Sequence, residues 1–311
     1  MTQAPAHIPV MLAEVLEALS PADGQTYIDG TFGAGGYTKA ILDAANCKVI
    51  GIDRDETAIA RAPDNARLTM VHGAFGDVEG HLKGLDIDGV DGFVLDLGVS
   101  SMQIDDGARG FSFNKNGPLD MRMDRSSGQS AYDLVNTWPE KELADIIWKY
   151  GEERHSRKIA SAIIKARAEK PIETTLVLAD IVAKALPKSF KKYALHPATR
   201  TFQALRIVVN GELDQLESAL NASLNILKEG GRLVVVSFHS LEDSIVKAFL
   251  RDHGAVQGGS RYAPEVVTRP VLFTQPVKKS VAASDNESRL NPRARSAKLR
   301  WAVRTSERIA A

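Results

Sequence analysis

The feature that most constrains the fold is a glycine-rich turn between a short apolar segment and a helical pattern. Residues 27–37 read Tyr-Ile-Asp-Gly-Thr-Phe-Gly-Ala-Gly-Gly-Tyr, and four glycines fall within seven of these residues. Glycine reaches positive φ without a Cβ clash, so such a run lets the backbone turn sharply and lie close to a ligand. Strand, glycine turn and helix are typical of the start of a nucleotide-binding α/β unit. Glycines also close ordinary loops, so this stretch alone does not establish a binding site.

Aspartates stand at the ends of three expected strands. Asp29, Asp53 and Asp96 each follow a run of apolar residues, and Asp53 comes 24 residues after Asp29. Open parallel sheets bind ligands where their strands end, and a carboxylate at that distance holds ribose hydroxyls in nucleotide binders. Each aspartate could instead cap the helix that follows it, but three beside a glycine turn favour a ligand site. The apolar strands are expected at Thr26–Asp29, Lys48–Asp53, 68–71, 92–98 and 232–238.

Length and composition indicate a soluble protein of two domains. The chain has 311 residues, of which 44% are hydrophobic and 25% are charged, as in ordinary globular proteins. The first residues lack the basic and apolar regions of a signal peptide, and no apolar run approaches the roughly 18 to 20 residues that span a bilayer. Cys47 is the single cysteine, which excludes an internal disulfide and fits a reducing compartment. We therefore expect a cytoplasmic protein that makes no membrane contact.

The net charge of zero conceals a strong asymmetry along the chain. Residues 1–106 hold 17 acidic and 6 basic side chains, a net of −11, so the remainder carries +11. Residues 149–206 hold 13 basic against 5 acidic side chains, and residues 288–311 hold 7 against 1. Each basic segment could be a solvated face, but two of them favour a polyanionic partner such as nucleic acid.

The strand pattern stops after Asp96. Residues 99–129 have no clear period, yet their aromatic and apolar content indicates an ordered loop rather than disorder. Thr137 and Glu140 suggest a capping box, with Pro139 in the first turn of the helix that follows. Helical patterns over residues 143–147, 159–166 and 178–185 have no strand between them, which predicts an inserted helical domain.

The strand pattern returns after one long helix, expected over residues 202–220. Ser240 and Asp243 are expected to cap the helix at 241–250. Residues 297–304 alternate apolar and basic side chains, which is typical of an antiparallel edge strand. The fold class is therefore α/β, a mostly parallel Rossmann-like sheet with an inserted all-helical domain. The predicted boundaries are 1–107 for the first part of the core, 108–204 for the basic insert and 205–311 for the second part.

The glycine turn fits one class of cofactor better than another. The dinucleotide pattern G-x-G-x-x-G, started at Gly33, requires glycine where Thr38 stands. This weakens a nicotinamide oxidoreductase. The acidic-x-G-x-G-x-G turn of S-adenosylmethionine methyltransferases is closer, with Thr31 in place of its first glycine, and that fold also has an antiparallel final strand.

Several longer motifs, in one order, closely resemble the bacterial 16S ribosomal RNA cytosine N4-methyltransferases, and the resemblance covers nearly the whole chain. The motifs are Asp29-Gly-Thr-Phe-Gly-Ala-Gly-Gly, His72-Gly-Ala-Phe75, Leu95-Asp96-Leu-Gly-Val-Ser-Ser, Arg109-Gly-Phe-Ser-Phe, Gly117-Pro-Leu-Asp-Met-Arg-Met-Asp124 and Ser237-Phe-His-Ser-Leu-Glu-Asp243. The family itself has Asp-Gly-Thr in the turn, so Thr31 is no departure from it.

The resemblance implies a class I methyltransferase that uses S-adenosyl-L-methionine. Its substrate would be one cytosine of the decoding centre in the 16S rRNA of the small ribosomal subunit. It implies that the turn at Gly33, Gly35, Gly36 and Tyr37 holds the methionine end of the cofactor, and that Asp53 binds the ribose. The remaining contacts, including those on the adenine side, are assigned to Phe75, Asp96 and Gln103. No metal site is expected.

The residues themselves agree with methyl transfer to nitrogen. Methylation at cytosine C5 needs a cysteine nucleophile, and Cys47 is expected in the core at the start of a strand, away from the ligand edge. Transfer to an exocyclic amine needs alignment of the amine with the methyl group and an acceptor for its N–H groups. The candidates for that acceptor are Ser100, Asn114, Asp120, Ser237 and His239, with backbone carbonyls as an equal alternative.

Simpler roles compete with several of these assignments. His239 could make only a helix-entry hydrogen bond, and Asp120 could form a loop ion pair with Arg122. Phe111 and Phe113 could stack on a base or simply pack in the core. The basic side chains expected to bind RNA phosphates are Arg154, Arg157, Lys158, Lys188, Lys191 and Lys192.

Two other classes of protein remain as alternatives. One is a nucleic-acid-binding protein with a vestigial cofactor pocket, and the other is the nicotinamide oxidoreductase that Thr38 disfavours. The oligomeric state, a homodimer included, stays open.

Overall fold

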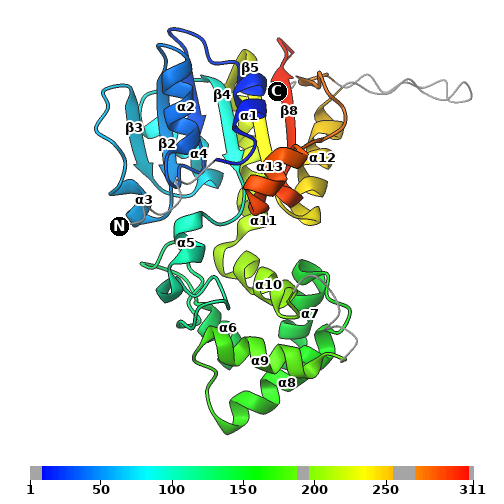
Figure 1. Cartoon of the computed structure of the whole chain (residues 1–311). Coiled ribbons are helices and arrows are strands. Elements are labelled where there is room, and N and C mark those ends of the chain that lie inside the picture. The colour runs from blue at the N-terminus through cyan, green and yellow to red at the C-terminus, as the bar shows by residue number, and fades with distance from the viewer. Residues whose placement is uncertain (1–8, 188–195, 255–269, 308–311) are drawn as a thin grey trace, which may run out of the picture. The chain divides into compact units, whose positions relative to one another are not determined.

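The computed structural model describes residues 9–187, 196–254 and 270–307, and the chain divides into two compact units. Unit 1 comprises Met1–Gly98 and Leu213–Ala311, and unit 2 comprises Val99–Glu212 (Figure 1). The insert therefore begins nine residues before the expected 107/108 boundary and ends eight residues after the expected 204/205 boundary. Residues 99–107 belong to unit 2 because they bond within it: Lys115 Nζ donates to the Asp105 carbonyl, and Gly117 packs against the Gly107 carbonyl.

Unit 1 is built on a mostly parallel sheet with the strand order β3-β2-β1-β4-β5-β8-β6, and β7 also pairs with β8. Strands β1 to β5 pair in parallel along this order, whereas β8 runs antiparallel to β5, β6 and β7. The bounds are β1 Thr26–Asp29, β2 Lys48–Asp53, β3 Leu68–His72, β4 Val90–Asp96, β5 Leu227–Ser237, β6 Phe273–Thr274, β7 Val281–Ala282 and β8 Lys298–Arg304. The expected fold class is confirmed, but β8 is not an edge strand.

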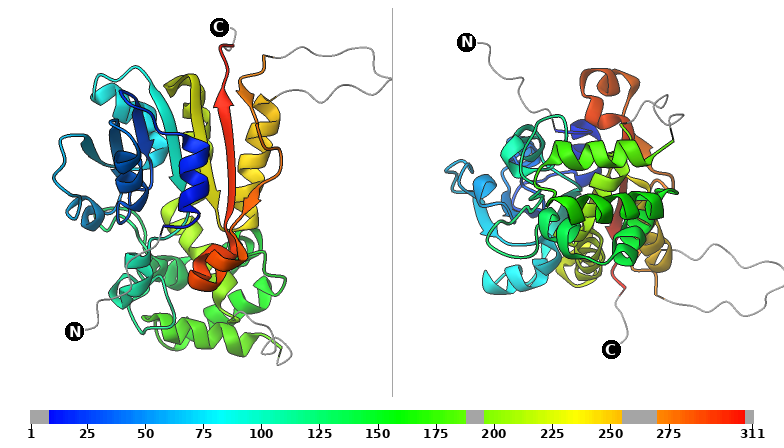
Figure 2. Two further views of the ribbon diagram at one scale, coloured as in Figure 1. Left: turned by 45° about the horizontal axis from the view of Figure 1, so that its top comes forward. Right: turned by 90° about the horizontal axis from the view of Figure 1, so that it is seen from below.

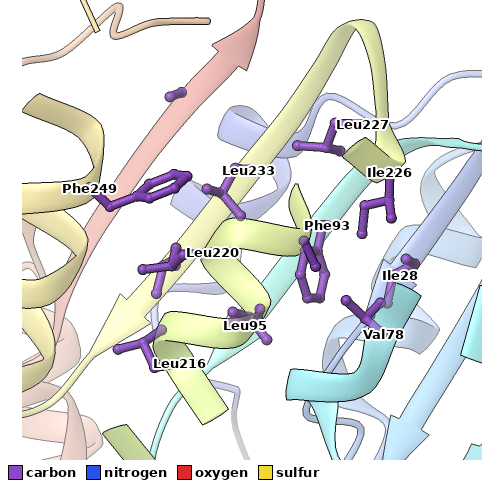
Figure 3. Close-up of a cluster of buried hydrophobic side chains, with 14 of the residues drawn as sticks. Ile28, Val78, Phe93, Leu95, Leu216, Leu220, Ile226, Leu227, Leu233 and Phe249 are labelled. Carbon is purple, nitrogen blue, oxygen red and sulfur yellow. The ribbon is translucent and has the colours of Figure 1, made fainter. Parts of the chain in front are cut away.

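Helices cover both faces of this sheet (Figures 1 and 2). Phe93 and Leu95 of β4 pack against Leu216 and Leu220 of α11 on one face (Figure 3). Val94, between them, packs on the other face with α1 and α2. Burial on both faces explains why the strands read as continuous apolar runs instead of alternating. The helices of this part are α1 Leu12–Leu19, α2 Gly36–Ala44, α3 Glu56–Ile59, α4 Val78–Gly84, α11 Glu212–Ile226, α12 Ser240–His253 and α13 Asp285–Leu290.

Unit 2 is helical and has its own hydrophobic core. Its helices are α5 Ser101–Asp105, α6 Ala131–Thr137, α7 Glu140–Gly151, α8 Ser156–Glu169, α9 Thr175–Ala185 and α10 Thr199–Asn210. The loop that the sequence predicted to be ordered is held by two buried polar side chains. Asn210 accepts from the amide of Met123 and donates to the carbonyl of Met121, both at 2.8 Å, while Arg109 donates to the carbonyls of Arg122 and Met123.

Two local predictions about helix ends in this region are wrong. The single helix expected over residues 202–220 is two helices, because Gly211 adopts φ 59° and ends α10. Thr137 does not cap α7: its hydroxyl donates back to the Asp133 carbonyl at 2.6 Å, and Pro139 precedes the helix. The capping box lies one helix earlier, between Ser130 and Asp133 at the start of α6.

No helix among the described residues is long and apolar enough to cross a membrane.

Candidate cofactor site at the carboxyl edge of the sheet

The glycine turn connects β1 to α2 and is shaped by close packing beneath it. Gly33 and Gly35 have positive φ, 53° and 75°, and Gly35 precedes the first residue of α2. A Cβ on Gly35 would stand 2.8 Å from the ring of Phe32, and one on Gly36 would stand 2.3 Å from Cγ of Pro9. Side chains at these positions would displace the turn, so glycine is required by backbone conformation at Gly35 and by space at both.

Asp53, at the end of β2, is tied directly to this turn. Its Oδ2 accepts from the amide of Gly33 at 2.7 Å, and its Oδ1 accepts from the amide of Asp55 at 2.8 Å. Burial raises the pKa of Asp53 above its ordinary value, although these amides oppose the shift. A carboxylate has about four acceptor positions, so these amides leave Asp53 able to accept from a ligand hydroxyl as well. The prediction that Asp29, Asp53 and Asp96 end strands of one parallel sheet is confirmed.

Asp29, at the end of β1, is almost fully buried and is held by Thr38. The Thr38 hydroxyl and amide donate to Asp29 Oδ2 at 2.7 and 3.2 Å. Burial raises the pKa of Asp29 from 3.8 to about 6, and the charge of Asp53 adds to the shift. In the sequence Thr38 weakens the dinucleotide pattern, and its hydrogen bonds to Asp29 are a further role that was not predicted. A hydroxyl nine residues after a strand-end aspartate, in the first turn of the helix, is the signal that could have found it.

Asp96, at the end of β4, presents the clearest unmet hydrogen-bonding group at this edge. Its amide donates to Thr31 Oγ1 at 2.7 Å, whereas its carboxylate Oδ1 is buried and has no partner among the described residues. Burial raises the pKa of Asp96 well above its ordinary value, and the charges of Asp29 and Glu242 add to this. A buried acceptor without a partner is rare in proteins, and a ligand donor would satisfy it. The carboxylate acceptors of Asp53 and Asp96 therefore fit a nucleoside cofactor, whose hydroxyl and amino groups donate hydrogen bonds.

The other predicted cofactor contacts, Tyr37, Phe75 and Gln103, do not end strands of the sheet as the aspartates do. The Tyr37 side chain is buried and its hydroxyl donates to the Val10 carbonyl, so only its backbone remains for a ligand. Phe75 starts a short 3₁₀ turn, Phe75–Asp77. Its Cβ lies so close to Gly30 that a Cβ added to that glycine would be 3.3 Å away. It thus stands next to the end of β1. Gln103 lies in unit 2, where it is buried in a capping box with Ser100.

Ser237 and His239 are the two acceptor candidates in unit 1. Ser237 is the last residue of β5, and His239 lies just beyond it. Val236 pairs with Asp96, so these residues lie at the same sheet edge. The Ser237 hydroxyl donates to the Lys298 carbonyl at 3.3 Å and keeps its acceptor positions. His239 precedes α12 and its Nδ1 accepts from the Glu242 amide at 3.4 Å. This is the helix-entry hydrogen bond that competed with a catalytic role for His239.

Glu242 holds this loop in place and was not singled out from the sequence. Its Oε2 accepts from the amides of Phe238 and His239 at 2.7 and 3.2 Å, and its Oε1 lies 3.1 Å from His239 Nε2. The predicted cap by Ser240 and Asp243 is therefore wrong. Asp243 instead accepts from Arg300 at 2.7 Å and Lys298 at 3.3 Å, both in β8.

The other three acceptor candidates lie in unit 2. Ser100 Oγ accepts from the Gln103 amide at 3.3 Å, and Asn114 is exposed. Asp120 forms a two-pronged ion pair with Arg122, at 2.7 and 3.2 Å. Burial alone would raise the pKa of Asp120, but the hydrogen bonds and charge of Arg122 hold it below its ordinary value. The loop ion pair that competed with a catalytic role for Asp120 is present.

The raised pKa of Asp29 predicts a pH dependence of stability. The Asp29 carboxyl keeps its proton up to a pH of about 6 in the folded state, whereas it loses that proton at a pH of about 3.8 in the unfolded state. The folded state therefore binds more protons in this window, and the free energy of unfolding falls by up to about 3 kcal/mol as the pH rises through it. Asp29→Asn, which keeps an acceptor for Thr38, is expected to remove this contribution.

Urea unfolding of both proteins at several pH values between 4 and 7 measures the effect. The difference between the variant and the wild type isolates Asp29 from the other carboxylates. A difference that stays constant across this range would contradict the assignment.

Comparison with known proteins identifies the family to which this chain belongs. The MraW methylase family matches residues 4–305. A protein of Hyphomonas neptunium named ribosomal RNA small subunit methyltransferase H is 54% identical over 97% of this chain and 90% of its own length. A protein of the same name from Afipia carboxidovorans is also 54% identical, over 96% of this chain and 91% of its own. A solved rRNA methylase of Streptococcus thermophilus aligns over 98% of this chain and 99% of its own with a TM-score of 0.41 and 10% identity. This likeness is too weak to assign the fold, which is identified by the order and directions of the strands. On its sequence, this chain belongs to the MraW methylase family.

Proposed function

We propose that this protein transfers a methyl group from S-adenosylmethionine to the exocyclic N4 amine of one cytosine in the 16S rRNA of the small ribosomal subunit. Its family and the printed names of its relatives support methylation of small-subunit rRNA. The observation that carries the proposal is the sheet edge where Asp53 is bonded to the glycine turn and Asp96 keeps a buried acceptor without a partner. The position and base are what the family resemblance implies.

The cofactor is S-adenosylmethionine, which supplies an electrophilic methyl group on a sulfonium. The backbone at Gly33, Gly35, Gly36 and Tyr37 would hold its methionine end, and Asp53 would accept from its ribose hydroxyls. Phe75, Asp96 and Gln103 would make the remaining contacts. The carboxyl groups suit this cofactor, because the charge of Asp53 raises the pKa of Asp29 and the charge of Asp29 raises that of Asp96, and a cationic ligand offsets this repulsion.

The chemistry at nitrogen needs no nucleophile from the protein, and Cys47 is unable to provide one. Cys47 precedes β2, at the opposite end of the strand from Asp53, and is fully buried. Its thiol lies 3.6 Å from the Ile41 carbonyl, and burial raises its pKa. A covalent attack on the base at C5 is therefore excluded for this residue.

Cys47→Ala is expected to keep methyl transfer and to lose only packing, about 1 kcal/mol of unfolding free energy. Methyl transfer to the substrate subunits and thermal unfolding measure the two effects separately. Loss of transfer in a variant that remains folded and binds cofactor would contradict chemistry at nitrogen.

The groups that orient the target amine remain a choice among the five candidates. Ser237 and His239 are favoured in unit 1, because they lie at and just beyond the end of β5, at the edge that carries Asp96. Either one could accept an N–H of the amine and leave the nitrogen lone pair directed at the methyl group. Backbone carbonyls of this edge remain equal alternatives.

RNA binding by unit 2 is proposed from its basic side chains. Arg154, Arg157 and Lys158 are exposed around the start of α8 and are free to contact phosphates in a salt-dependent way. Lys188, Lys191 and Lys192 lie outside the described residues. Phe113 packs against Phe202 and His196, with ring centroids 4.9 and 4.5 Å apart, so core packing explains it without a base.

The deciding experiment incubates the protein with labelled S-adenosylmethionine and small ribosomal subunits that lack the modification. Mass mapping of the rRNA should locate the label on N4 of a single cytosine. Label on cytosine C5 or on the protein would overturn the proposed chemistry, and failure to bind cofactor in calorimetry would favour a pure RNA-binding protein.

A parallel reaction with naked 16S rRNA shows whether the assembled subunit is required, and light scattering tests whether the protein is a homodimer. A cytoplasmic location follows from this substrate and from the single buried cysteine.

A further inference from the structure

Unit 1 carries a strongly basic surface near its C-terminus that the proposed function has not used. Residues 278–300 hold seven basic side chains against two acidic ones. Five of the basic side chains are exposed and together define the C-terminal basic surface: Lys278, Lys279, Arg289, Arg295 and Lys298. The acidic side chains nearby are Asp285, which is exposed, and Glu287 and Asp243, which are engaged in hydrogen bonds.

This surface lies at the same edge of the sheet as the candidate site. Lys298 starts β8 and pairs with Ser237 at the carboxyl end of β5, while the neighbouring Val236 pairs with Asp96. On the other side of β8, Ala282 of β7 also pairs with Lys298. α13 lies beside this end of β8 in Figure 1. The segment that carries the basic side chains therefore includes the end of β8 that lies beside the carboxyl end of β5.

The same segment is packed against the residues that support the glycine turn. Glu287 Oε1 in α13 accepts from the Met11 amide at 2.6 Å, and the adjacent Val10 carbonyl accepts from the Tyr37 hydroxyl. Arg295 Nε donates to the Ser288 carbonyl at 3.3 Å, which links the following 3₁₀ turn to α13. α13 and the turn that follows it are thus linked by hydrogen bonds to residues that support the glycine turn.

The strand order gives the sheet an electrostatic polarity. Residues 9–98, which supply β1 to β4, hold 15 acidic against 6 basic side chains, a net of −9. Residues 270–307, which supply β6 to β8, hold 8 basic against 3 acidic side chains, a net of +5. The order β3-β2-β1-β4-β5-β8-β6 places these two groups on opposite sides of β5. A polyanion is repelled from one side of the site and attracted to the other.

We propose that the C-terminal basic surface binds phosphates of the substrate RNA next to the target nucleotide, so that the RNA reaches the site from the β8 side of the sheet. This inference rests on the proposed function and adds to it a contact surface in the cofactor-binding unit itself. Exposed lysine and arginine side chains contact phosphates without reading sequence, and they fix the position of the nucleic acid. The surface would hold the strand while the target base is splayed out of its stack.

The test is a triple variant, Lys279→Ala, Arg289→Ala and Arg295→Ala, compared with the triple variant Lys39→Ala, Lys48→Ala and Lys83→Ala. Both remove three exposed positive charges from unit 1, the second set on the acidic side. The first variant is expected to raise KM for the small subunit roughly tenfold or more and to lower the slope of log affinity against log salt by about 2. The second is expected to behave like the wild type, and both should bind S-adenosylmethionine normally.

A third variant separates charge from local structure. Lys279→Arg, Arg289→Lys and Arg295→Lys keep all three charges and are expected to retain wild-type KM. The inference is overturned if the two alanine variants have equal KM and salt slopes, or if the charge-conserving variant is as impaired as the alanine variant. If the wild type does not methylate the subunit, the proposed function fails first, and the inference fails with it.

Discussion

Replacement of Asp53 by alanine is expected to weaken S-adenosylmethionine binding by about 100-fold or more. Two hydroxyl-to-carboxylate hydrogen bonds, worth roughly 1.5 kcal/mol or more each, would be lost with the side chain. The turn itself would also loosen, because Asp53 Oδ2 accepts from the Gly33 amide at 2.7 Å. Affinity for RNA is expected to stay nearly unchanged, because the proposed phosphate contacts lie elsewhere. Isothermal titration with cofactor, and separately with RNA, measures both quantities.

Two control variants make this result specific. Asp53→Asn keeps one acceptor and the side-chain volume but removes the charge, so it should fall between the wild type and the alanine variant. Asp64→Ala removes an exposed carboxylate of the same unit and should bind cofactor normally. Equal losses of cofactor and RNA affinity in Asp53→Ala would mean that the division between an acidic cofactor site and basic RNA surfaces is wrong.

Replacement of Glu242 by alanine is expected to lower the free energy of unfolding by about 4 kcal/mol. The Glu242 side chain is 2% exposed, and one of its oxygens accepts from the amides of Phe238 and His239. Without it, the amides of Phe238 and His239, between β5 and α12, lose the buried acceptor that they share. The loop that carries Ser237 and His239 would lose its fixed conformation, so methyl transfer should fall as well.

Urea unfolding of the free protein measures this effect, with two comparisons on the same helix. Glu242→Gln retains an oxygen acceptor and is expected to cost roughly half as much or less. Asp252→Ala removes an exposed carboxylate whose ion-pair partner is also exposed and is expected to change stability by less than about 0.5 kcal/mol. A Glu242→Ala variant as stable as Asp252→Ala would show that the buried carboxylate does not hold this loop.

Strand-end chemistry and local periodicity could be predicted from the sequence because they are encoded within a few residues. The apolar runs that end in Asp29, Asp53 and Asp96 are strands β1, β2 and β4, and the glycine turn joins β1 to α2. Helix ends were predicted less well because alternative caps lie within three residues of one another. At α12 both Ser240 and His239 could serve, and Glu242, not Asp243, completes the cap. The assignment of cofactor contacts to Gly33, Asp53 and the other residues remains a prediction.

The sequence by itself determined the α/β class, the glycine turn and the carboxylates that follow the strands, since each depends on neighbours along the chain. Only the tertiary structure decided which distant residues support them. Met11 bonds to Glu287 across 276 residues, and the pairing of β8 with β5 brings Lys298 to Ser237. Such contacts depend on the order of strands in the sheet, which no local pattern specifies. The same order places the acidic and basic segments on opposite sides of β5, so the electrostatic polarity of the site is a property of the fold rather than of any stretch of sequence.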